Sequence, residues 1–370
     1  MKRFFHMMAA VLITLTLVSW GYTGHYKISY NSSLSFYTQM SQFYNWTQYI
    51  ADHASDADDR KENDPTEAPK HYIDIDNYFE FTTTQTIPQT WDSVIVARGI
   101  YFVMNQGILP WATLATYDSL KKAMQRNDWE EAVFYAADLG HYVADGHMPL
   151  HITKNYNGQY SGNDGIHSRY ESTTINYNNS QIVYTGDTVK IIANINQYVF
   201  DYLYENYKLV DSIIIADDHA TSLSSNYYSS TYKAALWNKT KNFTIRLFKN
   251  ASHAIAELIY NAWLEAGCPA VGVAGILANS KPDNNMLLNN YPNPFNTYTD
   301  ISFFVPSNSE HIFLEVYNSI GHKISTISQG VLTEGNHMMR WEPAGVKQGV
   351  FFLVLRSRNF FVSKKVALIF

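Results

Sequence analysis

Apolar residues recur at helical spacing through much of the first 266 positions. The clearest case is the segment 128–146, which begins with Asp128, a residue suited to capping a helix. Its apolar stripe consists of Ala132, Tyr135, Leu139 and Tyr142. A second long helix is predicted over about residues 225–265, from the apolar positions Leu247, Ala251, Ile255, Leu258 and Ala262. Because only short strand-like stretches interrupt this pattern, residues 20–266 are predicted to form an all-α domain.

The pattern changes after Gly267. The stretch GCPAVGVAGILANSKPDNN is rich in small and turn-forming residues, and it predicts a linker over residues 267–285. Alternating apolar runs follow, among them ISFFV, IFLEVYN and VFFLVLR, with turn signals between them. Such runs are typical of short antiparallel strands, so residues 286–370 are predicted to form a small all-β sandwich.

The start of the chain has the features of an export signal. Lys2 and Arg3 precede an apolar run from Met7 to Val18, and the small residue Ser19 closes it. The run is short for a bilayer crossing and polar sequence follows at once, which makes a permanent membrane anchor the weaker alternative. Residues 1–19 are therefore predicted to be a signal peptide, and the mature chain is predicted to begin at Trp20.

Composition narrows the possible functions. A formal charge of −6 provides no broad basic surface for holding duplex nucleic acid, although a nuclease that grips its substrate locally stays possible. The length of 370 residues favours one large domain and a small one. Because Cys268 is the only cysteine, no disulfide can form within the chain. Stability outside the cytoplasm must then come from core packing or bound metal.

The predicted β domain contains four distinctive sequence motifs. They are NNYPNPFN at 289–296, VYNSIG at 316–321, GNHMMRW at 335–341 and QGVFFLVL at 348–355. Together they resemble the C-terminal sorting domain of the type IX secretion pathway, which implies an Ig-like sandwich recognised by the type IX secretion machinery. The chain would then pass the periplasm and the outer membrane, to be secreted or held at the cell surface. A carbohydrate- or surface-binding module is the alternative.

Histidine and carboxylate residues are spaced so that they can share a metal ion. His141 and Asp145 stand four residues apart, as do His167 and Glu171, so each pair lies on one face of a predicted helix. The surrounding motifs add further candidates: LGHYVADGHMPLHI at 139–152 with His151, KHYIDID at 70–76 with His71, HASDADDR at 53–60, and WGYTGH at 20–25. Imidazole and carboxylate are zinc ligands, and a carboxylate can bridge two ions.

In this combination, residues 20–265 resemble the superfamily of zinc-dependent phospholipase C and the single-strand-specific zinc nucleases. The resemblance implies a helical catalytic fold with three zinc ions. One ion would be held by Trp20, through its amino group and carbonyl, with His25. The other two would be held by the sets Asp56, His71, His141 and His151, His167, Glu171, with Asp145 bridging two ions. Asp58 is the alternative to Asp56, whose interval to His71 fits the family better.

The resemblance also implies the reaction. A zinc-bound hydroxide would attack the phosphorus of a phosphate ester in line, and Asp56 would orient or deprotonate the water. The GIHSRYE motif and the lack of cysteine pairs resemble the phospholipases, whereas the short Trp20–His25 interval resembles the nucleases. Phospholipase C-like hydrolysis is thus the first hypothesis, and a single-strand nuclease or nucleotidase is the second. A non-catalytic zinc-binding surface adhesin is a third, and it would need a broken ligand set.

Overall fold

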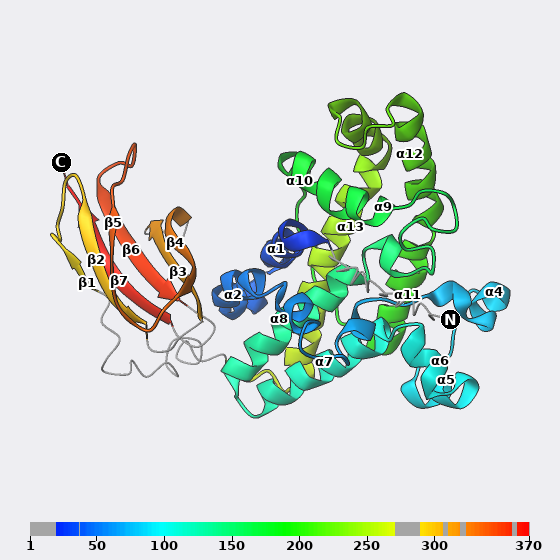
Figure 1. Ribbon diagram of the computed structural model, residues 1–370. Coiled ribbons are helices and arrows are strands. Elements are labelled where there is room, and N and C mark those ends of the chain that lie inside the picture. The colour runs from blue at the N-terminus through cyan, green and yellow to red at the C-terminus, as the bar shows by residue number, and fades with distance from the viewer. Residues whose placement is uncertain are drawn as a thin grey trace, which may run out of the picture. The chain divides into compact units, whose positions relative to one another are not determined.

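The structure is a computed structural model, and it describes residues 20–36, 38–270, 289–305, 310–318, 323–356 and 361–369. The chain divides into two compact units, Met1–Val271 and Gly272–Phe370. Figure 1 shows a helical first unit and a β-sheet second unit. The fold class predicted from the sequence, an all-α domain followed by an all-β domain, is therefore confirmed. The predicted signal peptide and most of the predicted linker lie outside the described residues.

The first unit consists of helices joined by loops and short turns of 3₁₀-helix. Its α-helices are α1 (Gly21–Asn31), α2 (Thr47–Asp52), α3 (Asp56–Arg60), α4 (Phe79–Thr84), α5 (Trp91–Arg98), α6 (Ile100–Asn105), α7 (Leu109–Gln125), α8 (Trp129–Asp145), α9 (Ile166–Ser168), α10 (Ile175–Asn178), α11 (Ile195–Tyr207), α12 (Val210–Leu223) and α13 (Ser230–Glu265). The 3₁₀ turns are η1 (Ser32–Ser35), η2 (Thr38–Trp46), η3 (Ala68–His71), η4 (Ile75–Asn77), η5 (Pro149–His151) and η7 (Asn179–Gln181), and η6 (Arg169–Thr174) is a π-helical stretch.

Helix α8 lies at the centre of this unit, where it packs against α7, α13 and α1. Asp128 caps it as predicted, since its Oδ1 accepts a hydrogen bond from the Glu131 amide at 3.2 Å. Every residue from Ala136 to Asp145 is buried. The end of α8 therefore delivers polar side chains into the protein interior. Ser229 caps α13 in the same way, with its hydroxyl accepting from the Tyr232 amide at 3.1 Å.

The second unit is built from two antiparallel sheets. Their strands are β1 (Asn289–Tyr291), β2 (Thr299–Val305), β3 (Glu310–Asn318), β4 (Lys323–Leu332), β5 (Gly335–Trp341), β6 (Gly349–Arg356) and β7 (Phe361–Leu368). The strand orders are β1-β2-β5 and β4-β3-β6-β7. Alternate residues of β2, which are Ile301, Phe303 and Val305, share one core with Leu314, Val316 and Leu353 of the other sheet. This arrangement is a β-sandwich.

Within the described ranges, none of the helices has the length and the apolar character that crossing a membrane would require.

Candidate metal centre

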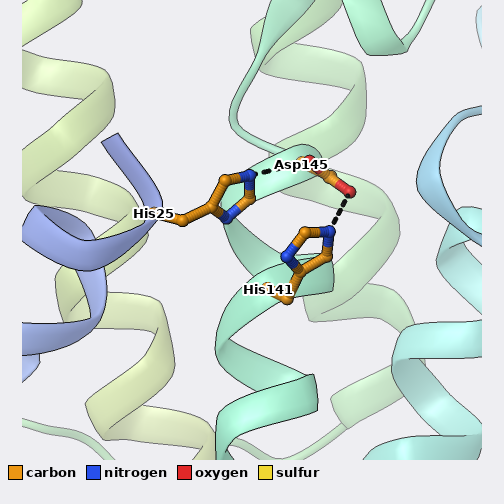
Figure 2. Close-up of side chains that lie close together, drawn as sticks. All are labelled: His25, His141 and Asp145. Carbon is orange, nitrogen blue, oxygen red and sulfur yellow. Dashed lines mark ion pairs between the residues drawn. The ribbon is translucent and has the colours of Figure 1, made fainter. Parts of the chain in front are cut away.

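Residues from the last turn of α8 and from α1 form one cluster. His141 and Asp145 lie four residues apart, and His141 Nε2 is 3.1 Å from Asp145 Oδ2. His25 of α1 reaches the same carboxylate, with its Nε2 3.4 Å from Asp145 Oδ1. Its ring stacks on that of His141 at a centroid distance of 4.1 Å. Figure 2 shows the three side chains, all fully buried, converging from two helices.

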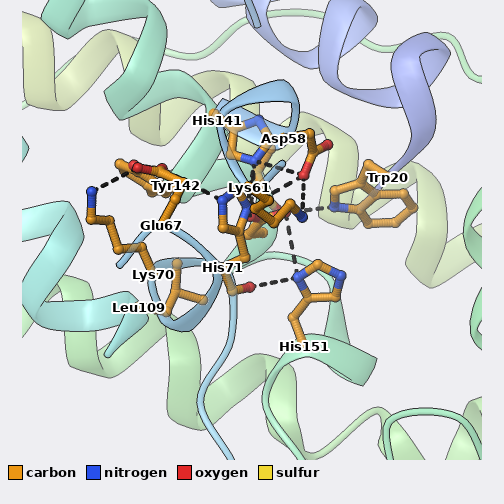
Figure 3. A network of polar contacts seen from close by, with 12 residues as sticks. Trp20, Asp58, Lys61, Glu67, Lys70, His71, Leu109, His141, Tyr142 and His151 are labelled. Atoms are coloured by element: carbon orange, nitrogen blue, oxygen red, sulfur yellow. Dashed lines mark hydrogen bonds and ion pairs between the residues drawn. The ribbon is translucent and has the colours of Figure 1, made fainter. Parts of the chain in front are cut away.

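A second cluster shares His141 with the first. His71, at the end of η3, has its Nδ1 3.4 Å from Asp58 Oδ1 and 2.9 Å from His141 Nε2. Asp58, on α3, completes the group with its Oδ1 3.7 Å from His141 Nε2. One ligand atom from each of the three residues lies within 4.8 Å of the others. Figure 3 shows these side chains meeting beside Trp20 and Lys61.

A third cluster brings together His151, His167 and Glu171. The Nε2 atoms of the two histidines are 3.2 Å apart, and Glu171 Oε2 is 2.7 Å from His167 Nε2 and 3.6 Å from His151 Nε2. His167 lies on α9, whereas Glu171 lies in the π-helical stretch η6 that follows it. The predicted pairing of residues 167 and 171 is present, although the helix between them is not regular.

Asp145 joins these clusters. Its Oδ1 faces His25 Nε2 and His151 Nδ1, each at 3.4 Å, whereas its Oδ2 faces His71 Nδ1 and His141 Nε2, each at 3.1 Å. Burial alone would raise the pKa of this carboxyl, but the neighbouring His141 and His151 hold it well below its usual value. The two oxygens therefore point at different ligand groups, as a bridging carboxylate does.

Backbone carbonyls orient three of the histidine rings. The Nδ1 atoms of His141, His151 and His167 donate hydrogen bonds to the carbonyl oxygens of Ala54 (2.6 Å), His71 (2.7 Å) and Tyr156 (3.1 Å). A neutral imidazole that donates through Nδ1 carries a lone pair on Nε2. The hydrogen bond at the far nitrogen fixes the tautomer and the ring orientation, as it does for histidines that bind metals.

These buried groups fit a metal ion. Among the described residues, His71 Nε2, Asp145 Oδ1 and both carboxylate oxygens of Glu171 are buried without a hydrogen-bond partner. Two lone pairs 3.2 Å apart, on His151 and His167, repel unless a cation lies between them. Burial opposes a charge on His141, yet Asp145 and Asp58 raise its pKa to about 9. The same negative field favours a metal cation, and the nitrogen and oxygen donors suit zinc.

The structure places Asp58, and not the preferred candidate Asp56, beside the histidines of the second cluster. Both residues lie on α3, but side chains two positions apart are about 200° apart around the helix axis, so they point to nearly opposite faces of the helix. Asp58 faces His71 and His141, whereas Asp56 Oδ2 lies 2.8 Å from His53 Nδ1 and its side chain is 36% exposed. Asp58, the alternative ligand, is therefore the aspartate that the fold brings into the cluster.

This placement leads to a first prediction. We expect Asp58→Asn to lower both the zinc content and the hydrolytic activity, by about tenfold or more in activity, because it removes a carboxylate that faces two histidines. Asp56→Asn is the matched control, since it changes the same residue type on the same helix but outside the clusters. Elemental analysis and an activity assay of both variants test the assignment. Equal losses, or a larger loss for Asp56→Asn, would contradict it.

Trp20 anchors the beginning of α1 beside Asp145. Its side chain is fully buried, and the indole Nε1 donates a hydrogen bond to the Ala144 carbonyl at 2.7 Å. Its ring packs edge-on against Phe248 at 4.7 Å and lies 6.0 Å from the ring of Tyr170. The side chain therefore anchors the start of α1 to the last turn of α8.

Sequence reasoning missed a buried carboxylate beside the second cluster. Glu67 is 1% exposed, and its Oε1 lies 3.6 Å from His71 Nε2. Tyr142 donates its hydroxyl to Oε1, and Lys70 Nζ donates to Oε2 at 2.7 Å (Figure 3). Although burial opposes ionisation, the contacts with His71, Lys70 and Tyr142 hold the pKa of Glu67 below its usual value. The signal was available, because Glu67 stands four residues before His71.

A buried arginine fixes the segment that carries two residues of the third cluster. Arg169, between His167 and Glu171, donates from Nη2 to Asp217 Oδ2 at 2.7 Å and from Nε to the Tyr232 hydroxyl at 2.8 Å. It also donates to the carbonyl oxygens of Asn163 and Asp164, at 3.1 and 2.6 Å. These bonds tie the loop and the π-helical stretch to α12 and α13. They explain how an irregular segment holds two ligand side chains in place.

Comparisons with known proteins match a sequence family to the second unit, and they find solved structures that are similar to the chain at low sequence identity. The model of the family described as "Secretion system C-terminal sorting domain" matches residues 289–369. No curated protein of similar sequence was found. Among solved structures, the chain is similar to the alpha toxin from Clostridium absonum, with a TM-score of 0.42 and 10% identity over 94% of this chain and 98% of that chain. It is also similar to the alpha-toxin of Clostridium perfringens from avian strain SWCP, with a TM-score of 0.40 and 10% identity over 95% and 97% of the two chains.

The match to the sorting family covers all of the described strands of the second unit, from β1 to β7. It includes the NNYPNPFN and QGVFFLVL motifs that the sequence singles out. The alternative of a carbohydrate- or surface-binding module is thereby set aside. Residues 289–369 are a sorting domain of the type IX secretion pathway, which directs the chain to the outside of the cell or to the cell surface.

Proposed function

We propose that the helical unit is a zinc-dependent phosphoesterase that hydrolyses phosphodiester bonds, with phospholipids as the preferred substrates. The observation that carries the proposal is the position of Asp145, whose two oxygens face different histidines at 3.1 to 3.4 Å. Adjacent metal sites joined by a carboxylate are typical of enzymes that hydrolyse phosphate esters, although aminopeptidases use them too. The resemblance of the motifs to the phospholipase C and nuclease superfamily favours the phosphoesterase.

Each ligand residue has a proposed assignment. His25 and Asp145 would hold one ion, together with the amino group and carbonyl of Trp20. Asp58, His71 and His141 would hold a second ion, with Asp145 bridging to it. His151, His167 and Glu171 would hold the third. Support comes from the three buried groups of ligand atoms, each within 4.8 Å, formed by residues from distant parts of the sequence.

Bound zinc would supply an activated water at neutral pH and would neutralise charge on the phosphate. The protein supplies the proton acceptor. Asp58 is suited to this role because its side chain is 19% exposed, so water can reach it. Burial opposes its ionisation, but His141, His25 and Lys61 lower the pKa of its carboxyl, which therefore stays ionised at neutral pH. In that state it can orient a water molecule or accept its proton.

The preference for phospholipid over nucleic acid rests on charge. A net charge of −6 gives the chain no general attraction to a polyanion, whereas a zwitterionic headgroup carries no net charge to repel. Single-strand nuclease or nucleotidase activity is the alternative within the same superfamily.

The test is a hydrolysis panel with the purified mature protein. We expect about three zinc ions per chain by elemental analysis, and cleavage of a short-chain phosphatidylcholine and of bis(p-nitrophenyl) phosphate. Chelation should abolish both activities, and added zinc should restore them. Faster cleavage of single-stranded DNA than of lipid would support the nuclease instead. Bound zinc without hydrolysis of any substrate would overturn the proposed activity and favour a zinc-binding adhesin.

A further inference from the structure

An exposed apolar corner lies where α5 meets α6. Val96 and Tyr101 are each 88% exposed, which no other large hydrophobic residue in the described ranges exceeds, and Ile100 between them is 42% exposed. Gly99 makes the corner, with φ of 77° and open space where a Cβ would stand. Figure 1 shows α5 and α6 at the periphery of the helical unit. We call Val96, Gly99, Ile100 and Tyr101 the apolar corner.

The four residues of the apolar corner carry no charge. Its neighbours in the sequence include Arg98, whose Nε donates to Glu80 Oε2 at 3.0 Å, and the exposed Asp92, one helical turn before Val96. Phe79, next to that glutamate, is itself 67% exposed. An uncharged, aromatic and aliphatic tip does not match a polyanion such as nucleic acid, which is bound through basic side chains. It matches the uncharged boundary between lipid headgroups and acyl chains, where tyrosine is enriched.

Size argues against a protein partner. A stable protein interface needs about 20 to 30 residues on each side, whereas the corner offers a few side chains. Insertion into a lipid surface does not need a large matching area, because each apolar side chain gains from leaving water independently. The export of the chain by its sorting domain places the corner where it can meet a membrane surface from outside.

Backbone hydrogen bonds join the segment that follows α6 to the segment around His71. Helices α4, α5 and α6 follow the segment after His71 in the chain, and the residues after α6 contact that segment again. On the return, Gln106 accepts from the Asp74 amide at 2.7 Å, and the Ile108 amide donates to the Pro69 carbonyl at 2.6 Å. The Leu109 amide then donates to the Tyr72 carbonyl at 3.2 Å. The helices that carry the apolar corner are thereby attached, through residues 106–109, to the segment that contains the predicted zinc ligand His71.

We propose that the apolar corner inserts into the surface of a lipid bilayer and holds the helical unit there. The inference rests on the proposed function in one respect only: that function makes the bound lipid the substrate as well. Binding itself is independent of hydrolysis, and it is expected for a zwitterionic surface.

The experiment compares the full mature chain with the double variant Val96→Ser/Tyr101→Ser. The matched control is Ile191→Ser/Tyr228→Ser, which removes an aliphatic and a tyrosine side chain that are 75% and 82% exposed elsewhere on the helical unit. Binding is measured by co-sedimentation with vesicles of a zwitterionic betaine lipid, which contains no phosphate ester. Hydrolysis is measured on phosphatidylcholine vesicles and on soluble bis(p-nitrophenyl) phosphate.

We expect the corner variant to lose vesicle affinity by about tenfold or more, since two apolar side chains no longer leave water. Its hydrolysis of vesicle lipid should fall with the affinity, its hydrolysis of the soluble ester should stay unchanged, and the control should bind as the wild type does. Equal binding by all three proteins would overturn the inference. So would a wild-type dimer in sedimentation analysis that the corner variant lacks. A wild type that binds vesicles but cleaves neither ester would contradict the proposed function and leave the inference intact.

Discussion

His141→Ala should remove most of the bound zinc and lower phosphodiesterase activity by at least about a hundredfold. The ring of His141 takes part in two of the three clusters, with Nε2 3.1 Å from Asp145 and 3.7 Å from Asp58. Even groups that only orient metal ligands cost about 10- to 100-fold in affinity or activity when they are removed. Removal of a residue shared by two predicted metal sites should lower zinc binding and activity further. Elemental analysis and the soluble-ester assay measure the two losses.

His147→Ala is the matched control. His147 is as deeply buried as His141, and its Nδ1 likewise donates to a backbone carbonyl, that of Val143 at 2.7 Å. Its ring stacks on Tyr202, and burial lowers its pKa to about 4, so it is neutral at physiological pH. Both truncations remove the same atoms from the interior and should destabilise the fold by similar amounts. Similar losses of zinc from both variants would show that the effect is one of stability and not of metal binding.

The two long helices could be predicted from the sequence because their apolar positions are periodic. The predicted stripe of α13 is buried throughout, from Leu247 to Ala262, and the helix begins at Ser230, within the predicted range. In α8 the stripe was a poorer guide, because Tyr135 is only half-buried whereas Asp138 and His141 are buried. Periodicity identifies the face toward the core. It does not reveal that a helix lies in the core on all sides.

In the candidate site, too, local contacts could be predicted from the sequence, whereas contacts between distant segments could not. Pairs four residues apart, such as His141 with Asp145, meet as predicted because local helix geometry places them together. The sequence favoured Asp56 over Asp58, but which of the two enters the cluster depends on which face of a five-residue helix turns toward residues far away in the sequence. The contacts of Arg169 with Asp217 and Tyr232 span 48 and 63 positions, and no local pattern announces them.

Adding one alanine before Trp20 should lower the zinc content of the mature protein and cut its activity sharply. If the free amino group and the carbonyl of residue 20 bind an ion, together they close a five-membered ring around it. An amide nitrogen in place of the amine is a far poorer ligand, and metal binding depends on a deprotonated donor. Removal of the signal peptide after Ser19 would then complete the site. Export would thereby switch the enzyme on.

Trp20→Phe separates this effect from simple anchoring. The substitution keeps the backbone groups but removes the indole hydrogen bond to the Ala144 carbonyl, which still accepts from the His147 amide at 3.0 Å. The lost hydrogen bond should cost about 0.5 to 1.5 kcal/mol. We therefore expect the phenylalanine variant to unfold at a lower temperature yet to keep its zinc. The alanine-extended protein should keep its helical content and lose zinc instead. If Trp20 acts only as a buried anchor, this order reverses. Mass spectrometry of fully active secreted protein that begins at any other residue would rule out the amino-group ligand.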